Sequence, residues 1–310
     1  MVALVSGGAH PLLAHAIAAQ LGVDPVPVTL SRYPDAEVVN VEASVRGADV
    51  YIIQPTPPPP EGHLVELLLI ADAAARAGAG RITAVTPYLG YSRQDRRANG
   101  ARTAVGARVI ADLLSSGRLD RLLTVDLHQP AVEGFFAIPV EHLEAFDTLL
   151  ARLGPIEQQS VVVAPDLGAA KLADRFAAAL KLPMAAVHKT RLSGLDVVAT
   201  RVTGDVRGLR PIIVDDMITT GSTVRAALEA LAAAGAAGGA IVAVTHAVFS
   251  AGAPAMLAQL GLHRLLATDS VPIDPVTAPN VEAVSLAPLL ADAIRRMHEG
   301  RSLAGLRSRH

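Results

Sequence analysis

PIIVDDMITTGST, residues 211–223, is the stretch that decides the fold of this chain. It starts as an apolar run, continues through two adjacent carboxylates, Asp215 and Asp216, and ends in a turn of Thr, Gly and Ser residues. The Ala-rich segment 224–234 follows and is typical of a helix. A buried strand, a small-residue turn and a helix form half of a βαβ unit. The stretch therefore predicts an α/β protein built on a parallel sheet.

The turn has the composition of a phosphate site. Its successive backbone N–H groups can point at a phosphate, with the helix N-terminus behind them. The candidate phosphate-binding residues are Thr219, Thr220, Gly221, Ser222 and Thr223. Asp215 and Asp216 suit sugar hydroxyls or a hydrated divalent cation, so the predicted ligand is a ribose phosphate. The alternative interpretation is a strand end capped by Asp, with Thr219 or Thr220 as the N-cap of the helix.

The composition excludes several classes of protein. The 310 residues suffice for one large or two medium domains, and aromatic residues make up only 3%. The core must therefore consist of Ala, Val, Leu and Ile. A net charge of −2 argues against bulk electrostatic binding of nucleic acid or of a membrane surface. The chain has no cysteine, no signal-peptide pattern and no apolar run long enough to span a membrane, so we expect a soluble cytoplasmic protein.

Short runs rich in Val and Ile alternate with longer Ala- and Leu-rich segments. Predicted strands cover 2–6, 50–53, 82–86, 122–125, 161–164, 184–187, 212–214 and 241–245. Predicted helices cover 11–21, 64–77, 105–114, 169–180 and 224–234. This alternation predicts parallel sheets with helices on both faces, whose ligands bind at the carboxyl ends of the strands. The proline-rich segment 55–60 is interpreted as a rigid loop, and the segment 143–159 as the boundary between two similar domains.

A second cluster, PYLGYSRQDRR at residues 87–97, directly follows a predicted strand. With Arg102 it places four arginines within ten positions of a nearly neutral protein. Guanidinium groups suit polyphosphate oxygens, and Gln94 and Asp95 could read the edges of a base or ribose. The alternative interpretation is a solvated charged loop, which two tyrosines in a chain with only four make less attractive.

These motifs resemble those of a known family. The stretch 211–223 resembles the phosphoribosyl-pyrophosphate binding motif shared by phosphoribosyltransferases and ribose-phosphate diphosphokinases. PYLGYSRQDRR resembles the PYFGYARQDRK-type segment that the diphosphokinases carry and the transferases lack. RYPDAE at 32–37, SVRGADVY at 44–51, DLHQPAVEGFF at 126–136 and VAPDLG at 163–168 resemble further diphosphokinase segments in the same order. The resemblance extends from about Leu4 to near His298.

The resemblance implies roles for individual residues. ATP would be held by Asp35, Glu37, Arg93, Gln94, Arg102 and His128. His128 and Asp166 would support a magnesium–nucleotide site. Lys189 and Arg191, two cations that project to the same side of an extended chain, would stabilise charge on the transferring phosphoryl group. Asp215 and Asp216 would hold the ribose diol, and residues 219–223 the 5-phosphate of ribose 5-phosphate.

The implied fold is two similar α/β domains, each a mostly parallel sheet flanked by helices, in a tandem phosphoribosyltransferase-like arrangement. They would cover residues 1–145, which bind ATP, and 146–310, which bind ribose 5-phosphate, with the C-terminal helix packing back on the first. The implied reaction is diphosphoryl transfer from ATP to ribose 5-phosphate, giving 5-phosphoribosyl 1-diphosphate and AMP for nucleotide, His and Trp biosynthesis. Mg²⁺ would be the cofactor, and the chain would form a dimer-based oligomer, typically a hexamer.

The chain departs from the family pattern at three places: Thr219, Ala169 and Ala36 replace a common Asp and two common glycines. The alternatives are a phosphoribosyltransferase that uses the same sugar diphosphate and a non-catalytic regulatory homologue. The intact Lys189, Arg191, Asp215 and Asp216 argue against the second.

Overall fold

The computed structural model describes residues 1–32, 37–97, 101–192 and 197–306; for residues 32, 37, 189–192 and 197–200 it describes the backbone alone. The described chain divides into two compact units. The N-terminal unit comprises residues 1–145, 270–272 and 285–310, and the C-terminal unit comprises residues 146–269 and 273–284. None of the described helices is long and apolar enough to cross a membrane.

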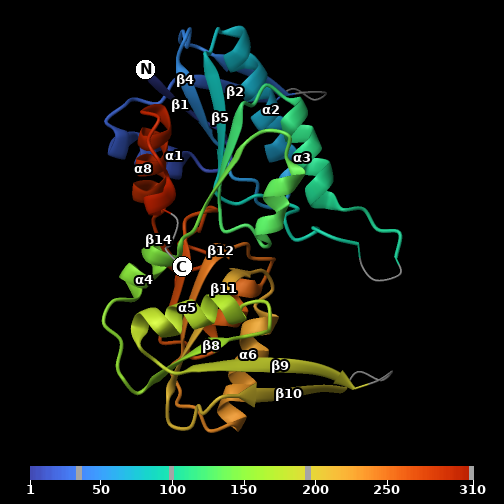
Figure 1. Ribbon diagram of the computed structural model, residues 1–310, viewed down its shortest axis with the longest axis vertical. Coiled ribbons are helices and arrows are strands. Elements are labelled where there is room, and N and C mark those ends of the chain that lie inside the picture. The colour runs from blue at the N-terminus through green and yellow to red at the C-terminus, as the bar shows by residue number, and fades with distance from the viewer. Residues whose placement is uncertain (33–36, 98–100, 193–196, 307–310) are drawn as a thin grey trace. The chain divides into compact units, whose positions relative to one another are not determined.

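The N-terminal unit is built on a five-stranded parallel sheet. Its strands, in spatial order, are β1 (Val2–Ser6), β4 (Asp49–Ile53), β5 (Arg81–Thr86), β6 (Arg121–Val125) and β7 (Val140–Leu143). A separate antiparallel hairpin joins β2 (Val28–Arg32) to β3 (Glu37–Val41). The helices are α1 (Pro11–Leu21), α2 (Pro60–Arg76), α3 (Gly106–Ser116) and α8 (Ala287–His298), with the 3-10 turns η1 (Pro130–Phe135) and η2 (Ala304–Leu306). Helices α1 and α8 cover one face of the sheet, and α2 and α3 cover the other (Figure 1).

The C-terminal unit contains a seven-stranded sheet. Its spatial order is β10 (Val197–Thr203), β9 (Met184–Leu192), β8 (Ser160–Ala164), β11 (Arg210–Ile218), β12 (Ile241–Ala247), β13 (Arg264–Thr268) and β14 (Glu282–Val284). Every pair is parallel except β9 with β10. The helices are α4 (Phe146–Leu153), α5 (Ala170–Leu180), α6 (Ser222–Ala233) and α7 (Ala253–Ala258). The predicted fold class, parallel sheets flanked by helices, is confirmed in both units.

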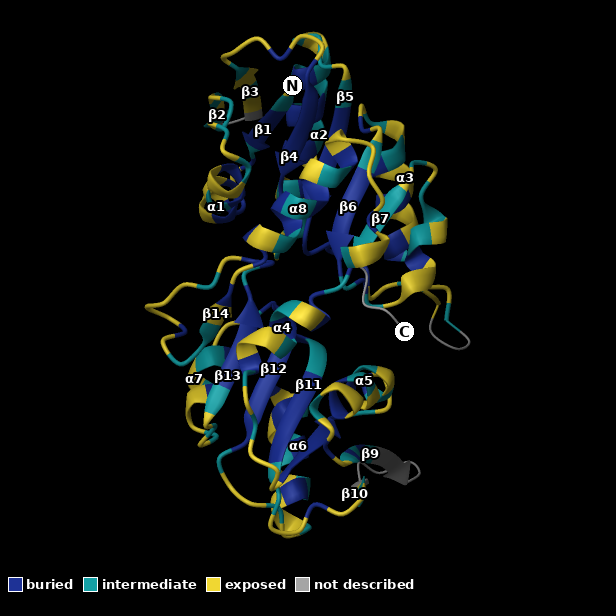
Figure 2. Ribbon diagram, turned by 60° about the vertical axis from the view of Figure 1, so that its left-hand side comes forward, coloured by how far each residue is buried: buried dark blue, intermediate teal, exposed yellow. Residues whose placement is uncertain are grey.

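Burial explains why the central strands read as continuous apolar runs. All residues of β4, β8 and β12 are buried, because helices cover both faces of a parallel sheet (Figure 2). Helix α1 has a proline in its first turn and ends at Gly22, whose φ of 71° suits glycine. The predicted bounds of β1 and α1 are confirmed to the residue.

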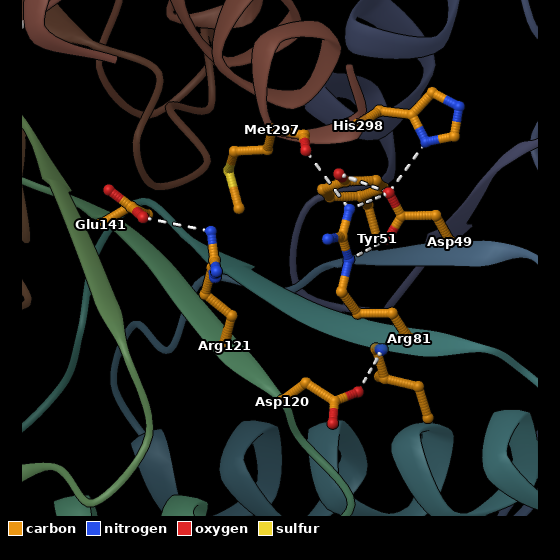
Figure 3. A network of polar contacts seen from close by, with 9 residues as sticks. Asp49, Tyr51, Arg81, Asp120, Arg121, Glu141, Met297 and His298 are labelled. Carbon is orange, nitrogen blue, oxygen red and sulfur yellow. Dashed lines mark hydrogen bonds and ion pairs between the residues drawn. The ribbon is translucent and has the colours of Figure 1, made fainter. Parts of the chain in front are cut away.

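A buried carboxylate joins α8 to the sheet of the N-terminal unit (Figure 3). Asp49 Oδ1 accepts a hydrogen bond from Arg81 Nε at 2.8 Å, and Asp49 Oδ2 accepts one from Tyr51 Oη at 2.9 Å. His298 Nδ1 lies 2.9 Å from Asp49 Oδ2, and Arg81 Nη2 donates to Met297 O at 3.3 Å. Burial raises the pKa of Asp49, but hydrogen bonds from Arg81, His298 and Tyr51 outweigh burial and hold it below its ordinary value.

Candidate active site

The predicted nucleotide-binding residues of the N-terminal unit lie in loops at the carboxyl edge of its sheet. Arg93 and Gln94 are exposed in the loop that follows β5, and the half-buried His128 follows the neighbouring strand β6. The exposed Arg102 lies in the segment that leads into α3. Ala107 N–H, in the first turn of α3, donates to Gln94 O at 3.1 Å. The loop after β5 and the start of α3 are therefore in contact.

The predicted adenosine-binding carboxylates belong to the β2–β3 hairpin. Asp35 lies outside the described residues, between the two strands. Glu37 begins β3, where its backbone pairs with Arg32, and its side chain is not described. Their role in binding ATP stays a prediction.

The C-terminal unit brings its predicted site residues to three neighbouring strands, β9, β8 and β11. Asp166 follows the end of β8, and its Oδ1 accepts from Gly168 N–H at 2.8 Å and from Ala169 N–H at 3.3 Å at the start of α5. Asp215 and Asp216 lie on β11, directly beside β8. The carboxyl edge of this sheet therefore carries acidic groups from two adjacent strands.

The strand β11 ends later than the sequence predicted. Asp215 and Asp216 were expected to follow a strand ending at Val214, whereas β11 continues to Ile218. The reason is β12, which pairs with β11 as far as Ile218, while pairing with β8 stops at Ile213. The acidic pair is thus held by a strand on one side only. The other side of β11 opens toward the loop that carries Asp166.

The hydroxyl-rich turn leads into α6, which begins at Ser222. Its N-cap is Gly221, which has no side chain, so the alternative of Thr219 or Thr220 as the N-cap residue is wrong. Thr220 Oγ1 accepts from Ser222 N–H at 3.3 Å and lies 2.9 Å from Ser222 Oγ. The first turn of a helix leaves backbone N–H groups without an intrahelical partner, and an anion can accept hydrogen bonds from them.

Gly221 is required by two local features. Its φ is 75°, in the left-handed region, and a Cβ there would approach Met256 Cε to 2.4 Å and Leu257 Cδ2 to 3.1 Å. Thr219, at the start of the turn, accepts from Ser250 N–H at 3.1 Å through its carbonyl. The turn is therefore held against the segment 250–257 as well as by α6.

Burial and mutual repulsion both act on the carboxylates of this edge. Burial, followed by the negative charges of Asp216 and Asp166, raises the pKa of Asp215 to about 8. A divalent cation nearby would relieve this repulsion. Within the described chain, no three His, Asp or Glu side chains converge to hold a metal on their own. The carboxylates of this edge suit Mg²⁺, because Mg²⁺ usually keeps several waters and binds proteins through only one or two carboxylates, together with substrate phosphates.

The two predicted metal-site residues belong to different units, His128 to the N-terminal unit and Asp166 to the C-terminal unit. Lys189 and Arg191 lie within β9, which extends to Leu192 instead of ending at Val187 as expected. The strand is longer because β10 pairs with it antiparallel, with Lys189 opposite Thr200 and Arg191 opposite Val198. Their side chains are not described.

The residues that support the arginine-bearing loop were not predicted from the sequence. Thr56 lies within the proline-rich segment after β4 and Glu61 directly follows it, and both contact the loop after β5. A single threonine among five prolines, just after a buried strand, was the available signal.

The chain resembles known proteins over nearly its whole length. Residues 2–117 match the N-terminal domain of ribose phosphate pyrophosphokinase, and residues 196–307 match the phosphoribosyl synthetase-associated domain. A ribose-phosphate pyrophosphokinase of Corynebacterium efficiens is 41% identical over 98% of this chain and 94% of its own length. The Pasteurella multocida relative of the same name is 41% identical over 98% of each chain.

A solved structure agrees with these sequence relatives. The crystal structure of phosphoribosylpyrophosphate synthetase from Mycobacterium smegmatis matches with a TM-score of 0.90 and 38% identity. The match covers 96% of this chain and 99% of that one.

Proposed function

Because this chain belongs to the ribose-phosphate pyrophosphokinase family, we propose that it transfers a diphosphoryl group from ATP to ribose 5-phosphate. The anomeric hydroxyl attacks the β-phosphorus of ATP, the bond to the α-phosphate oxygen breaks, and 5-phosphoribosyl 1-diphosphate and AMP result. The observation that carries this proposal is the carboxyl edge of the C-terminal sheet. There an acidic pair on β11 precedes the hydroxyl-rich turn and the N-terminus of α6.

Each group of residues has a distinct task in this reaction. Residues 219–223 hold the 5-phosphate, and Asp215 and Asp216 accept hydrogen bonds from the ribose diol. Arg102 and His128 contact the phosphates of ATP, while Asp35, Glu37, Arg93 and Gln94 hold its adenosine. Lys189 and Arg191 stabilise charge that develops on the transferring group. Positioning and electrostatics supply the catalysis, as is general for phosphoryl transfer.

Asp166 and His128 would support Mg²⁺ that arrives with the nucleotide. When bound, Mg²⁺ would supply positive charge that offsets the negative charge of the phosphates. From the family resemblance we also propose self-association into a dimer-based oligomer, which light scattering of the purified chain tests.

AMP release tests the function directly. The purified chain is incubated with ribose 5-phosphate, ATP and magnesium, and AMP is measured with and without inorganic phosphate. A phosphoribosyltransferase would instead need a free base and would yield pyrophosphate. AMP formation that depends on ribose 5-phosphate supports the proposal, and its absence refutes it.

Lys189→Ala tests the assigned catalytic role. Removing one group that stabilises transition-state charge lowers turnover by about 10²-fold or more, whereas ATP binding persists. The matched control is Lys181→Ala, which removes an exposed lysine at the C-terminal end of α5. Equal turnover in both variants would contradict the role of Lys189.

A further inference from the structure

The loop that carries Arg93 and Gln94 is attached to a single buried threonine. Thr56 N–H donates to Tyr88 O at 2.9 Å, and Thr56 Oγ1 also donates to Tyr88 O, at 3.2 Å. Gly90 N–H in turn donates to Thr56 Oγ1 at 2.7 Å. The hydroxyl of Thr56 therefore uses its donor and an acceptor site on two residues of the same loop.

This attachment is buried and tightly packed. Thr56 is fully buried, Gly90 is buried, and Tyr88 is 8% exposed. A Cβ at Gly90 would lie 2.8 Å from Pro60 Cβ and 2.9 Å from Thr56 O. The backbone of the loop therefore lies directly against the start of α2. Proline fixes φ, so the segment between Thr56 and Pro60 offers little freedom to follow a shift of the loop.

The far end of the loop is attached as well. Tyr91 adopts a φ of 64°, and its hydroxyl donates to Glu61 in the first turn of α2. Gln94 N–H donates to Tyr91 O at 2.9 Å, and Gln94 O accepts from the start of α3. The loop is thus fixed between α2 and α3. Arg93 and Gln94 are exposed at its outer end.

We propose that Thr56 is a positioning residue of the nucleotide site, because its hydroxyl sets the loop conformation in which Arg93 and Gln94 meet ATP. This inference rests on the proposed function. Without the hydroxyl, the buried Gly90 N–H loses its acceptor, and such a group destabilises the conformation that contains it. When only a fraction of the molecules holds the loop in the binding conformation, the apparent affinity for ATP is the intrinsic affinity multiplied by that fraction.

The chain supplies a matched control. Thr124 in β6 is as fully buried as Thr56, yet its Oγ1 has no hydrogen-bond partner among the residues that the structure describes. The same substitution at both positions therefore removes a bonded hydroxyl in one case and an unbonded one in the other. Thr→Val preserves shape, so packing changes little at either site.

The test compares Thr56→Val, Thr56→Ser and Thr124→Val in the AMP-release assay. In Thr56→Val we expect the KM for ATP to rise about tenfold. Its kcat and its KM for ribose 5-phosphate should change little, since ground-state and transition-state binding of ATP weaken together. Thr56→Ser keeps the hydroxyl and should restore the KM for ATP. Thr124→Val should leave all three constants unchanged.

The outcomes separate this inference from the proposed function. A wild-type chain that releases no AMP refutes the proposed function, and with it the role of Thr56. An active wild-type chain whose Thr56→Val variant keeps the KM for ATP refutes the positioning role alone. A Thr56→Val variant in which kcat and both KM values change to a similar extent also refutes the positioning role, because that pattern indicates a general loss of structure.

A second measurement applies if Thr56→Val does not fold. Amide hydrogen exchange of Gly90 in the wild-type chain reports the contact directly. We expect protection comparable to that of β5, because a buried acceptor holds this N–H. Exchange as fast as that of the exposed residues of the loop would overturn the inference.

Discussion

Replacing Asp49 by Asn tests what holds α8 to the N-terminal unit. The variant keeps the shape of the side chain but removes its charge, and it replaces one acceptor oxygen by a donor. Asp49 Oδ2 accepts hydrogen bonds from Arg81 and Tyr51 and lies 2.9 Å from His298 Nδ1. An amide nitrogen is a donor, so it cannot accept these hydrogen bonds. Tyr51 is fully buried, so its hydroxyl gains no compensating water.

The structure sets the size of the effect. Hydrogen bonds to a charged group contribute about 1.5–3 kcal/mol each, and breaking a buried ion pair costs about 3–5 kcal/mol. The Asp49 side chain is 9% exposed, but that of Arg81 is 38% exposed, so water solvates part of the remaining charge. We therefore expect a loss of about 2–4 kcal/mol in the free energy of unfolding. That corresponds to a decrease in Tm of about 5–15 °C.

Asp112→Asn is the matched control. Asp112 forms a 2.7 Å ion pair with Arg108 on α3, with both side chains more than half exposed, and such pairs contribute about 0.3–0.5 kcal/mol. Urea unfolding measures the free energy of both variants, and hydrogen exchange of α8 amides shows where Asp49→Asn acts. A loss no larger in Asp49→Asn than in Asp112→Asn would refute the reasoning.

The pH dependence has a defined sign. The folded pKa of Asp49 is held below its ordinary value of 3.8, so the stabilisation is present above that value and is lost as the pH falls through the folded pKa. The difference between wild type and Asp49→Asn should thus be constant from about pH 7 to pH 5 and shrink below about pH 4. A difference that grows in acid would contradict the assignment.

Two further predictions concern the proposed ribose 5-phosphate site. The pKa of Asp215 is raised to about 8, so its ionisation destabilises the folded state as the pH rises from its ordinary pKa toward 8. Urea unfolding without ligand across this pH range should therefore show Asp215→Asn gaining stability relative to wild type. A stability difference between the two that does not change with pH would contradict the shift. Gly221→Ala places a Cβ where φ is 75° and Met256 is 2.4 Å away, whereas Gly252→Ala meets a φ of 84° with open space. Both should lose about 1–2 kcal/mol of stability, but only Gly221→Ala should raise the KM for ribose 5-phosphate in the AMP-release assay.

The sequence predicted the architecture because the signals of a buried parallel sheet are local. Continuous Val- and Ile-rich runs identified β4, β8 and β12, whose residues are all buried. Strands whose composition is mixed escaped detection. The exposed hairpin β2–β3 and the strand β10 are stabilised by antiparallel partners, which a local pattern does not reveal.

The sequence singled out the residue types of the candidate site but not the contacts that support them. The acidic pair, the hydroxyl-rich turn and the arginine cluster are contiguous in sequence, so composition alone identified them as candidates. The contacts that fix them are long-range. Gly90 meets Thr56 across 34 positions, and Asp49 meets His298 across 249. No local pattern contains such pairs, because only the folded topology brings them together.

Strand length explains how the C-terminal sheet can be rigid and still open to a ligand. Beyond Ile213, β11 has no partner on the β8 side among the described strands, yet β12 holds it as far as Ile218. On one side of the acidic pair β12 therefore holds the backbone of β11, and on the other side the pairing of β11 with β8 has already ended. A site on a rigid element keeps its geometry better than one on a loop. A β8 extended by two residues would continue its pairing alongside Asp215, so the end of β8 at Ala164 is what leaves this side of β11 without a strand partner among the described residues.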